Sequence, residues 1–189
     1  MARQRRNPEP ALFCDYVAPG PDQIRARLVF YMSVSIRKIG ESDITAVLEL
    51  MREFAAFENL TDQLTITEEL LREAMFDDMG FVEGFVAEDV KAIVGFALFY
   101  PCFSSFRGQR GLYLEDIYIK PEYRGHGVGK TMLREIARIA ASRGFERIDF
   151  QVLDWNTNAV AFYEGLSAVS DNDTRHFKFT DDAFKDLAS

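Results

Sequence analysis

The sequence reads Arg124-Gly125-His126-Gly127-Val128-Gly129 between an apolar run at 112–119 and an amphipathic helical pattern. Glycines at alternate positions remove the side chains that would block a close approach to the backbone. They also leave several N–H groups at the positive end of the helix dipole. Such a loop suits a phosphate or diphosphate group, and Arg124 can add a charge-assisted hydrogen bond to the same anion. The loop therefore predicts an anion site where a strand meets a helix.

The spacing of this loop excludes two common phosphate-binding motifs. A P-loop needs glycine five positions before its Gly-Lys-Ser/Thr, and Arg124 stands five positions before Gly129-Lys130-Thr131. A dinucleotide-binding fingerprint needs Gly-x-Gly-x-x-Gly at the first strand of the fold, and this loop reads Gly-x-Gly-x-Gly. A turn that only connects a strand to a helix remains an alternative on the residues alone.

Outward from the loop, the apolar pattern predicts a mixed α/β chain in which strands dominate the middle and helices flank both ends. Three apolar runs indicate a strand meander. Thr67 is expected to cap a helix, and Gly144 to end one. The expected elements are a strand near 34–36, helices from 44 to 55 and from 67 to 75, strands over 81–87, 92–100 and 112–119, a helix over 132–140, a strand over 147–153, a helix over 157–166, and a final apolar alternation through Phe177 and Phe179.

Length and composition favour one globular domain. The chain has 189 residues, 48% of them hydrophobic, which is enough to bury one ordinary core. Residues 1–32 carry prolines and arginines without periodicity, so we expect a disordered N-terminal extension. Glu9, Asp15 and Asp22 argue against a mitochondrial presequence, because transit peptides are poor in acids. The folded domain is expected over residues 33–189.

Charge and cysteine content limit the partners. The formal net charge is −8, from 22 basic and 30 acidic side chains, which disfavours nucleic acid and favours cationic ligands, although solubility alone also explains an acidic chain. Cys14 and Cys102 lie too far apart to suggest a disulfide framework or a zinc site, so a reducing compartment such as the cytoplasm is expected. The longest apolar run, 92–100, is too short to span a membrane.

The pattern Arg-x-x-Gly-x-Gly resembles the diphosphate-binding signature of the GNAT acetyltransferases. The resemblance covers nearly all of the chain after Ser33 and is nearest to the spermidine/spermine acetyltransferases and, especially, the thialysine N-epsilon-acetyltransferases. It implies an α/β fold of the acyl-CoA N-acyltransferase type, with a central mixed, mainly antiparallel sheet flanked by helices. The blocks that carry it are Glu53-Phe54-Ala55-Ala56-Phe57-Glu58, Ile93-Val94-Gly95-Phe96-Ala97, Leu112-Tyr113-Leu114-Glu115-Asp116-Ile117-Tyr118-Ile119, Pro121-Glu122-Tyr123-Arg124-Gly125, Val152-Leu153-Asp154-Trp155-Asn156 and Ala161-Phe162-Tyr163.

The resemblance implies acetyl-CoA as the acetyl donor, with no metal. Main-chain groups after the acidic pair would contact the cofactor and stabilise charge on the acetyl oxygen. An N-cap or turn role is the alternative for Asn156. The implied cofactor-binding positions are Ile117, Tyr118, Ile119, Arg124, Gly125, His126, Gly127, Val128, Gly129, Lys130, Asn156 and Tyr163.

Two residues are candidates for proton transfer. An amine must lose a proton before it can attack a thioester, and the resemblance assigns that base to Glu115. Since neighbouring strand residues face opposite ways, Asp116 is expected to be structural. The alternative for these two acids is that they lie at an exposed edge or form a salt bridge. Tyr163 matches the family's general acid, which would protonate the departing thiolate; an aromatic packed in the core is the alternative.

Substrate recognition is expected at Phe57 and Glu58, which match the family's substrate-facing helix end. With Glu115 they would surround a cation by negative charge and an aromatic wall. An exposed helix face is the alternative. His126 is expected to contribute only its backbone, and His176 has no recognisable partner.

The resemblance implies a homodimer that acetylates a small cationic amine by direct attack. A protein or peptide acetyltransferase and a non-catalytic CoA-binding module remain open. Ser167 stands where the family usually has glycine, and Arg175 stands in place of a tryptophan. Both departures concern the C-terminal wall of the substrate pocket.

Overall fold

A computed structural model describes residues 20, 34–90, 92–171 and 173–189. The predicted N-terminal extension therefore lies, except for Gly20, outside the described residues. The chain forms two compact units, one ending at Phe150 and the other running from Gln151 to Ser189.

The first unit is built on one five-stranded sheet in the order β1-β2-β3-β4-β5. The first four strands are antiparallel neighbours, and β5 runs parallel to β4. The predicted strand meander is thus confirmed, as is a mixed, mainly antiparallel sheet. The strands are β1 (Ser35–Lys38), β2 (Glu83–Asp89), β3 (Ala92–Ser104), β4 (Gln109–Ile119) and β5 (Ile148–Asp149).

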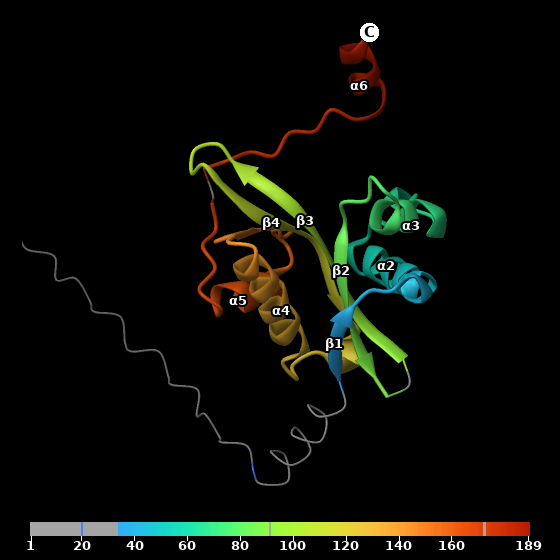
Figure 1. Ribbon diagram of the computed structural model, residues 1–189, viewed down its shortest axis with the longest axis vertical. Helices are drawn as coiled ribbons and strands as arrows, with labels where there is room; N and C mark the ends of the chain where they lie inside the picture. The colour runs from blue at the N-terminus through green and yellow to red at the C-terminus, as the bar shows by residue number, and fades with distance from the viewer. Residues whose placement is uncertain (1–19, 21–33, 91, 172) are drawn as a thin grey trace, which may run out of the picture. The chain divides into compact units, whose positions relative to one another are not determined.

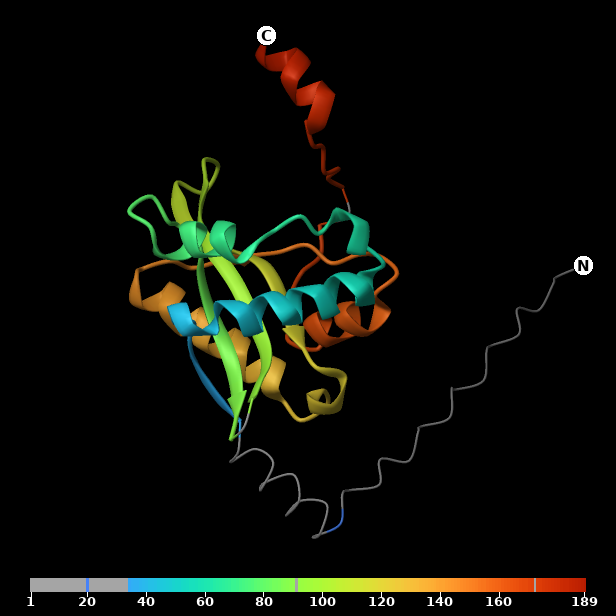
Figure 2. The same ribbon diagram turned by 90° about the vertical axis from the view of Figure 1, so that its right-hand side faces the viewer.

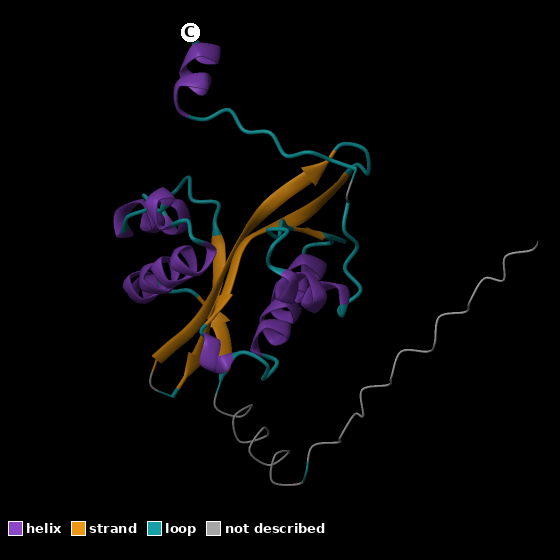
Figure 3. Ribbon diagram, turned by 180° about the vertical axis from the view of Figure 1, so that it is seen from behind, coloured by secondary structure: helices purple, strands orange, loops and turns teal. Residues whose placement is uncertain are grey.

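Helices cover both faces of this sheet. Figure 1 shows α2 (Ile44–Glu58) and α3 (Glu68–Phe76) on one face and α4 (Val128–Ser142) on the other, and the same layers are seen from behind in Figure 3. Figure 2 shows α2 crossing the strands. This layering follows from the alternation of side chains along each strand, because both faces of the central strands are apolar.

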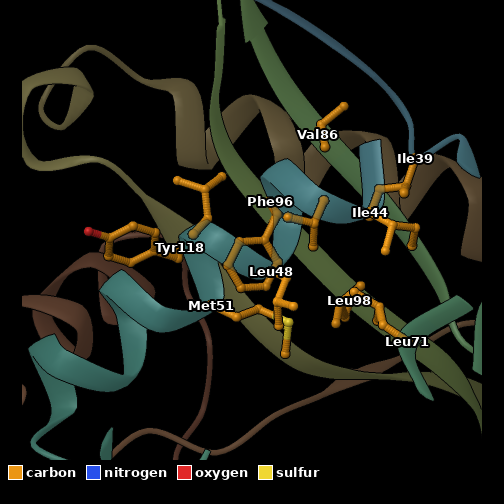
Figure 4. Close-up of a cluster of buried hydrophobic side chains, with 11 residues drawn as sticks. Ile39, Ile44, Leu48, Met51, Leu71, Val86, Phe96, Leu98 and Tyr118 are labelled. Carbon is orange, nitrogen blue, oxygen red and sulfur yellow. The ribbon is translucent and has the colours of Figure 1, made fainter. Parts of the chain in front are cut away.

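Two hydrophobic clusters fill the spaces between these layers. Along β3, Phe96 and Leu98 point to α2 and α3, whereas Ala97 and Phe99 point to α4. Figure 4 shows the cluster on the α2 side, with Tyr118 at its edge. The face of the sheet that packs against α2 and α3 is called the α2 face.

The helix boundaries follow the expected capping signals. The hydroxyl of Thr67 accepts a hydrogen bond from the Leu70 N–H, as predicted for the start of α3. Gly144 has a φ of +72° and ends α4. The N–H groups of Gly144 and Phe145 bond back to Ala141 and Ala140, the pattern of a Schellman motif.

The second unit contains α5 (Thr157–Glu164) and α6 (Asp181–Ala188). The predicted helix over 157–166 is confirmed, with a slightly earlier end. The apolar alternation through Phe177 and Phe179 does not form a strand among the described residues, and both rings are exposed. The sequence interpretation also missed α6. An alternating pattern becomes a strand only where a partner supplies hydrogen bonds.

The predicted strand over 147–153 was too long. Only Ile148 and Asp149 pair with β4, opposite Leu112 and Tyr113. Periodicity reports which side chains are apolar, whereas strand length depends on how far two strands stay side by side. No described helix has both the length and the apolar composition needed to cross a membrane.

Candidate functional site

The glycine loop has the backbone geometry of an anion site. Gly125 and Gly127 have φ values of +75° and +82°, which disfavour residues with a side chain. A Cβ added at Gly125 would meet no atom within 4 Å, so the space beside this residue is open. Gly127 is the N-cap of α4 and provides no side-chain cap for the first N–H groups of the helix. These features fit an anionic group such as a phosphate or diphosphate.

The loop side chains differ in exposure. Arg124 and Lys130 are exposed, and His126 and Gly129 are partly buried. Val128 is buried and packs with the α4-side cluster, which fixes the start of the helix. The charged side chains of the loop are therefore the accessible ones.

The edge of β4 that faces away from β3 is open beyond Tyr113. In the described residues, no strand pairs with this edge from Leu114 to Ile119. The Lys120 N–H donates to the Val94 carbonyl on β3, and main-chain groups alternate in direction along a strand. The main-chain groups of Ile117 and Ile119 therefore face the open edge, and those of Tyr118 face β3.

Arg124 lies against this open edge. Its Nε donates to the carbonyl oxygen of Ile119 at 2.8 Å. Its guanidinium carbon lies 4.8 Å from the ring centroid of Phe57 and 5.3 Å from that of Tyr118. The structure thus joins the glycine loop to the C-terminal turn of α2.

An irregularity in β4 places the two acids. Leu98 pairs with Asp116 and Phe99 pairs with Leu114, so Glu115 is an extra residue in a β-bulge. Asp116 faces α2 because its partner Leu98 does. The Tyr100 hydroxyl, two residues along β3 from Leu98, donates to Glu115 at 2.9 Å. The expectation that the acids face opposite ways is wrong, because the bulge turns both toward the α2 face.

The two carboxylates have different surroundings. Glu115 is exposed and bonded by Tyr100, whereas Asp116 is partly buried. Burial, then the nearby charges of Glu115 and Glu58, raise the pKa of Asp116 to about 7. Burial also raises the pKa of Glu58. The structure therefore gathers three acids, Glu58, Glu115 and Asp116, on the α2 face.

Aromatic rings lie next to Glu115. Tyr100 stacks on Tyr113 with ring centroids 5.4 Å apart, and Phe81 meets Tyr100 edge-on at 5.7 Å. The sequence interpretation missed Tyr100. Its place two residues after Leu98 on one strand face is the signal that would have found it.

Asn156 and Tyr163 lie in the second unit, at the start of α5 and near its end. The Asn156 side chain accepts a hydrogen bond from the Ala159 N–H at 3.2 Å, so it is the N-cap of α5. Tyr163 is partly buried, and burial raises its pKa to about 12. Its hydroxyl therefore stays protonated at neutral pH, which a proton donor requires.

No group of His, Cys, Asp and Glu able to hold a metal ion occurs in the described part of the chain.

Known proteins resemble this chain in both sequence and fold. The profile of the acetyltransferase (GNAT) family matches residues 44–167. A thialysine N-epsilon-acetyltransferase of Bos taurus is 39% identical over 166 residues, which cover 82% of this chain and 97% of that protein. A spermidine/spermine N(1)-acetyltransferase-like protein of Homo sapiens is 32% identical over 81% of this chain and 23% of its own length.

Solved structures share the fold. A metagenomic aminoglycoside acetyltransferase, crystallised with sisomicin, superimposes with a TM-score of 0.68 at 20% identity, covering 80% of this chain and 98% of that one. At this identity the likeness shows the fold alone. The expected acyl-CoA N-acyltransferase fold is thus confirmed.

Proposed function

We propose, from the premise that this chain belongs to the acetyltransferase (GNAT) family and is an N-acetyltransferase, that it acetylates the primary amine of a small cationic substrate. A thialysine-type amino acid or a polyamine fits best, by the relatives' names. The observation that carries the proposal is the gathering of Glu58, Glu115 and Asp116 on the α2 face of β4. Three acids so close favour a cation.

Acetyl-CoA supplies the acetyl group as an activated thioester. The loop 125–130, with Arg124, would bind its diphosphate through backbone N–H groups and a guanidinium. The open β4 edge at Ile117 and Ile119 would pair with the amides of the cofactor's long arm, as an added strand does. The ring of Tyr118 packs against the guanidinium of Arg124. Asn156 is proposed as a further cofactor contact on the family resemblance alone.

Glu115 would take the proton from the substrate ammonium, directly or through water, so that the amine nitrogen can attack. A carbon–nitrogen bond then forms and the carbon–sulfur bond breaks. Main-chain N–H groups at the β4 edge would stabilise the negative charge on the acetyl oxygen. The departing thiolate would take its proton from the Tyr163 hydroxyl, and the second proton that the nitrogen loses on becoming an amide would restore that hydroxyl, directly or through water. Glu58 would border the substrate, and the ring of Phe57, the residue before it, lies against Arg124.

The proposal includes a homodimer in the cytoplasm. Cys102 is a free thiol in the structure, which fits a reducing compartment.

The test is release of free thiol from acetyl-CoA by purified protein offered thialysine, ornithine, spermidine, putrescine and lysine-containing peptides. We expect turnover on the small cationic amines. Preference for the peptides would instead support a protein acetyltransferase. Binding of CoA without turnover on any amine would support a non-catalytic module.

The Tyr163→Phe variant tests the proton donor. Because only the hydroxyl is lost, we expect kcat to fall by roughly a hundredfold or more, while the Kd for CoA changes little. Calorimetry measures the Kd and thiol release measures kcat. Phe162→Leu, at the neighbouring ring, is the matched control and should keep most activity. An unchanged kcat in Tyr163→Phe would contradict the assigned role.

A further inference from the structure

The partners of Arg124 come from two separate parts of the chain. Tyr118 is on β4, and Phe57 is in the last turn of α2. Both rings lie within cation–π range of the guanidinium, at 5.3 and 4.8 Å. The hydrogen bond from Nε to the Ile119 carbonyl oxygen is a third contact of the Arg124 side chain. The guanidinium is thus held by two rings and one hydrogen bond.

Tyr118 is the fixed part of this arrangement. Its residue is only 5% exposed, its ring lies 5.6 Å from that of Phe54, and its hydroxyl donates to Glu53. Glu53 also pairs with Lys120 at 2.9 Å. Because these neighbours hold the Tyr118 ring in place, the ring is a fixed surface against which Arg124 packs.

Phe57 is the adjustable part. It is 39% exposed, so a substitution there leaves the core intact. Its ring contacts the Arg124 guanidinium from α2, while the ring of Tyr118 contacts it from β4. In the described residues, the side-chain hydrogen bond of Arg124 is made through Nε, which leaves its Nη groups as donors for an anion.

We propose that Phe57 is a positioning residue of the cofactor site: its ring holds the Arg124 guanidinium on Tyr118, so that the Nη donors are oriented toward the diphosphate of coenzyme A. This inference rests on the proposed function, because it assumes that the loop at 124–130 binds coenzyme A. Phe57 is thereby assigned to the cofactor site, whereas the sequence resemblance had placed it at the wall of the amine pocket. Glu58, the next residue, stays with the acids of the α2 face.

The physical reason is preorganisation. A long arginine side chain loses rotamer freedom when it binds an anion, and that loss weakens binding. A guanidinium already held by Phe57 and Tyr118 has lost this freedom before the cofactor arrives. Removing one ring should therefore weaken CoA without changing the amine pocket.

Isothermal titration of CoA into the full chain tests this inference. We expect Phe57→Leu to raise the Kd roughly threefold to tenfold, the size of a cation–π contact. Phe57→Trp keeps an aromatic face and should retain wild-type affinity. The KM for the amine should stay within about twofold in Phe57→Leu, since the substrate acids are unchanged.

A double-mutant cycle shows whether Phe57 acts through Arg124. Arg124→Gln should itself weaken CoA, and adding Phe57→Leu to it should then cost less than about twofold more. Thermal melting of each variant confirms that the fold is retained.

Two failures are distinguishable. If wild-type protein does not bind CoA, the proposed function fails. If wild-type protein binds CoA and Phe57→Leu binds it equally well, or raises only the amine KM, the inference about Phe57 fails alone.

Discussion

The surroundings of Asp116 disfavour the ionised form of its carboxyl group. It is partly buried beside Glu115 and Glu58, and these surroundings raise its pKa to about 7. Burying an acid next to two others weakens folding, and such groups are typical of sites that bind or transform a ligand. A cationic substrate would lower this cost, because it supplies the missing positive charge.

The Asp116→Asn variant should become more stable than wild type as the pH rises. A carboxyl whose pKa is higher in the folded state binds more protons there, so wild-type stability falls as pH rises from about 4 to about 7 and is then level. Asparagine does not ionise. The gain should therefore be absent near pH 4 and reach a few kcal/mol above pH 7, at about 1.4 kcal/mol per pKa unit.

Urea unfolding at a series of pH values measures this gain. Asp62→Asn, at an exposed acid, is the control for the substitution of an aspartate by asparagine. A gain of equal size at pH 4 and pH 8 would contradict the explanation from the Asp116 charge.

At the scale of elements, three helices end in the same way with three different residues. Asn59 after α2, Gly144 after α4 and Ser167 after α5 all have positive φ values, of 59°, 72° and 66°. At α5, the N–H groups of Ser167 and Ala168 bond back to Glu164 and Tyr163, as in a Schellman motif. Glycine and asparagine adopt this conformation readily, whereas serine does not. The departure from the family's glycine is therefore a strained helix end.

The Ser167→Gly variant should be more stable than wild type. The left-handed conformation costs a residue with a side chain about 1–2 kcal/mol, and the greater freedom of glycine in the unfolded chain offsets about half of that. We expect a net gain of about 0.5–1 kcal/mol in urea unfolding. Ser170→Gly, at an exposed residue that does not have positive φ, should give no gain. Equal effects of the two changes would contradict strain at Ser167.

At the scale of the whole molecule, the second unit exposes many apolar side chains. Phe177, Phe179, Phe184 and Leu187 are all more than half exposed. Folded proteins seldom leave many large apolar side chains exposed, so these side chains need a covering surface, and the proposed homodimer would supply one.

Light scattering after size exclusion should give twice the 21.6 kDa of one chain. Burial of the apolar side chains in a subunit interface is the physical reason. The mass should be the same across a tenfold range of protein concentration. A mass of one chain throughout that range would contradict the homodimer.

Local signals in the sequence were enough for most of the elements and for the glycine loop. Thr67 and Gly144 mark helix ends because capping depends on a few neighbouring residues. Residues 81–87, 92–100 and 112–119 read as strands because both faces are apolar. Positive φ at Gly125 and Gly127 follows from the same short stretch.

The sequence by itself therefore determined the order of the elements up to α5, the glycine loop and the family, because each depends on residues close together in the chain. Only the tertiary structure decided which side chains meet. The bulge that turns Glu115 and Asp116 to one face is a matter of register between two strands. The contact of Phe57 with Arg124 joins residues far apart in the chain, and it exists because α2 packs across β4.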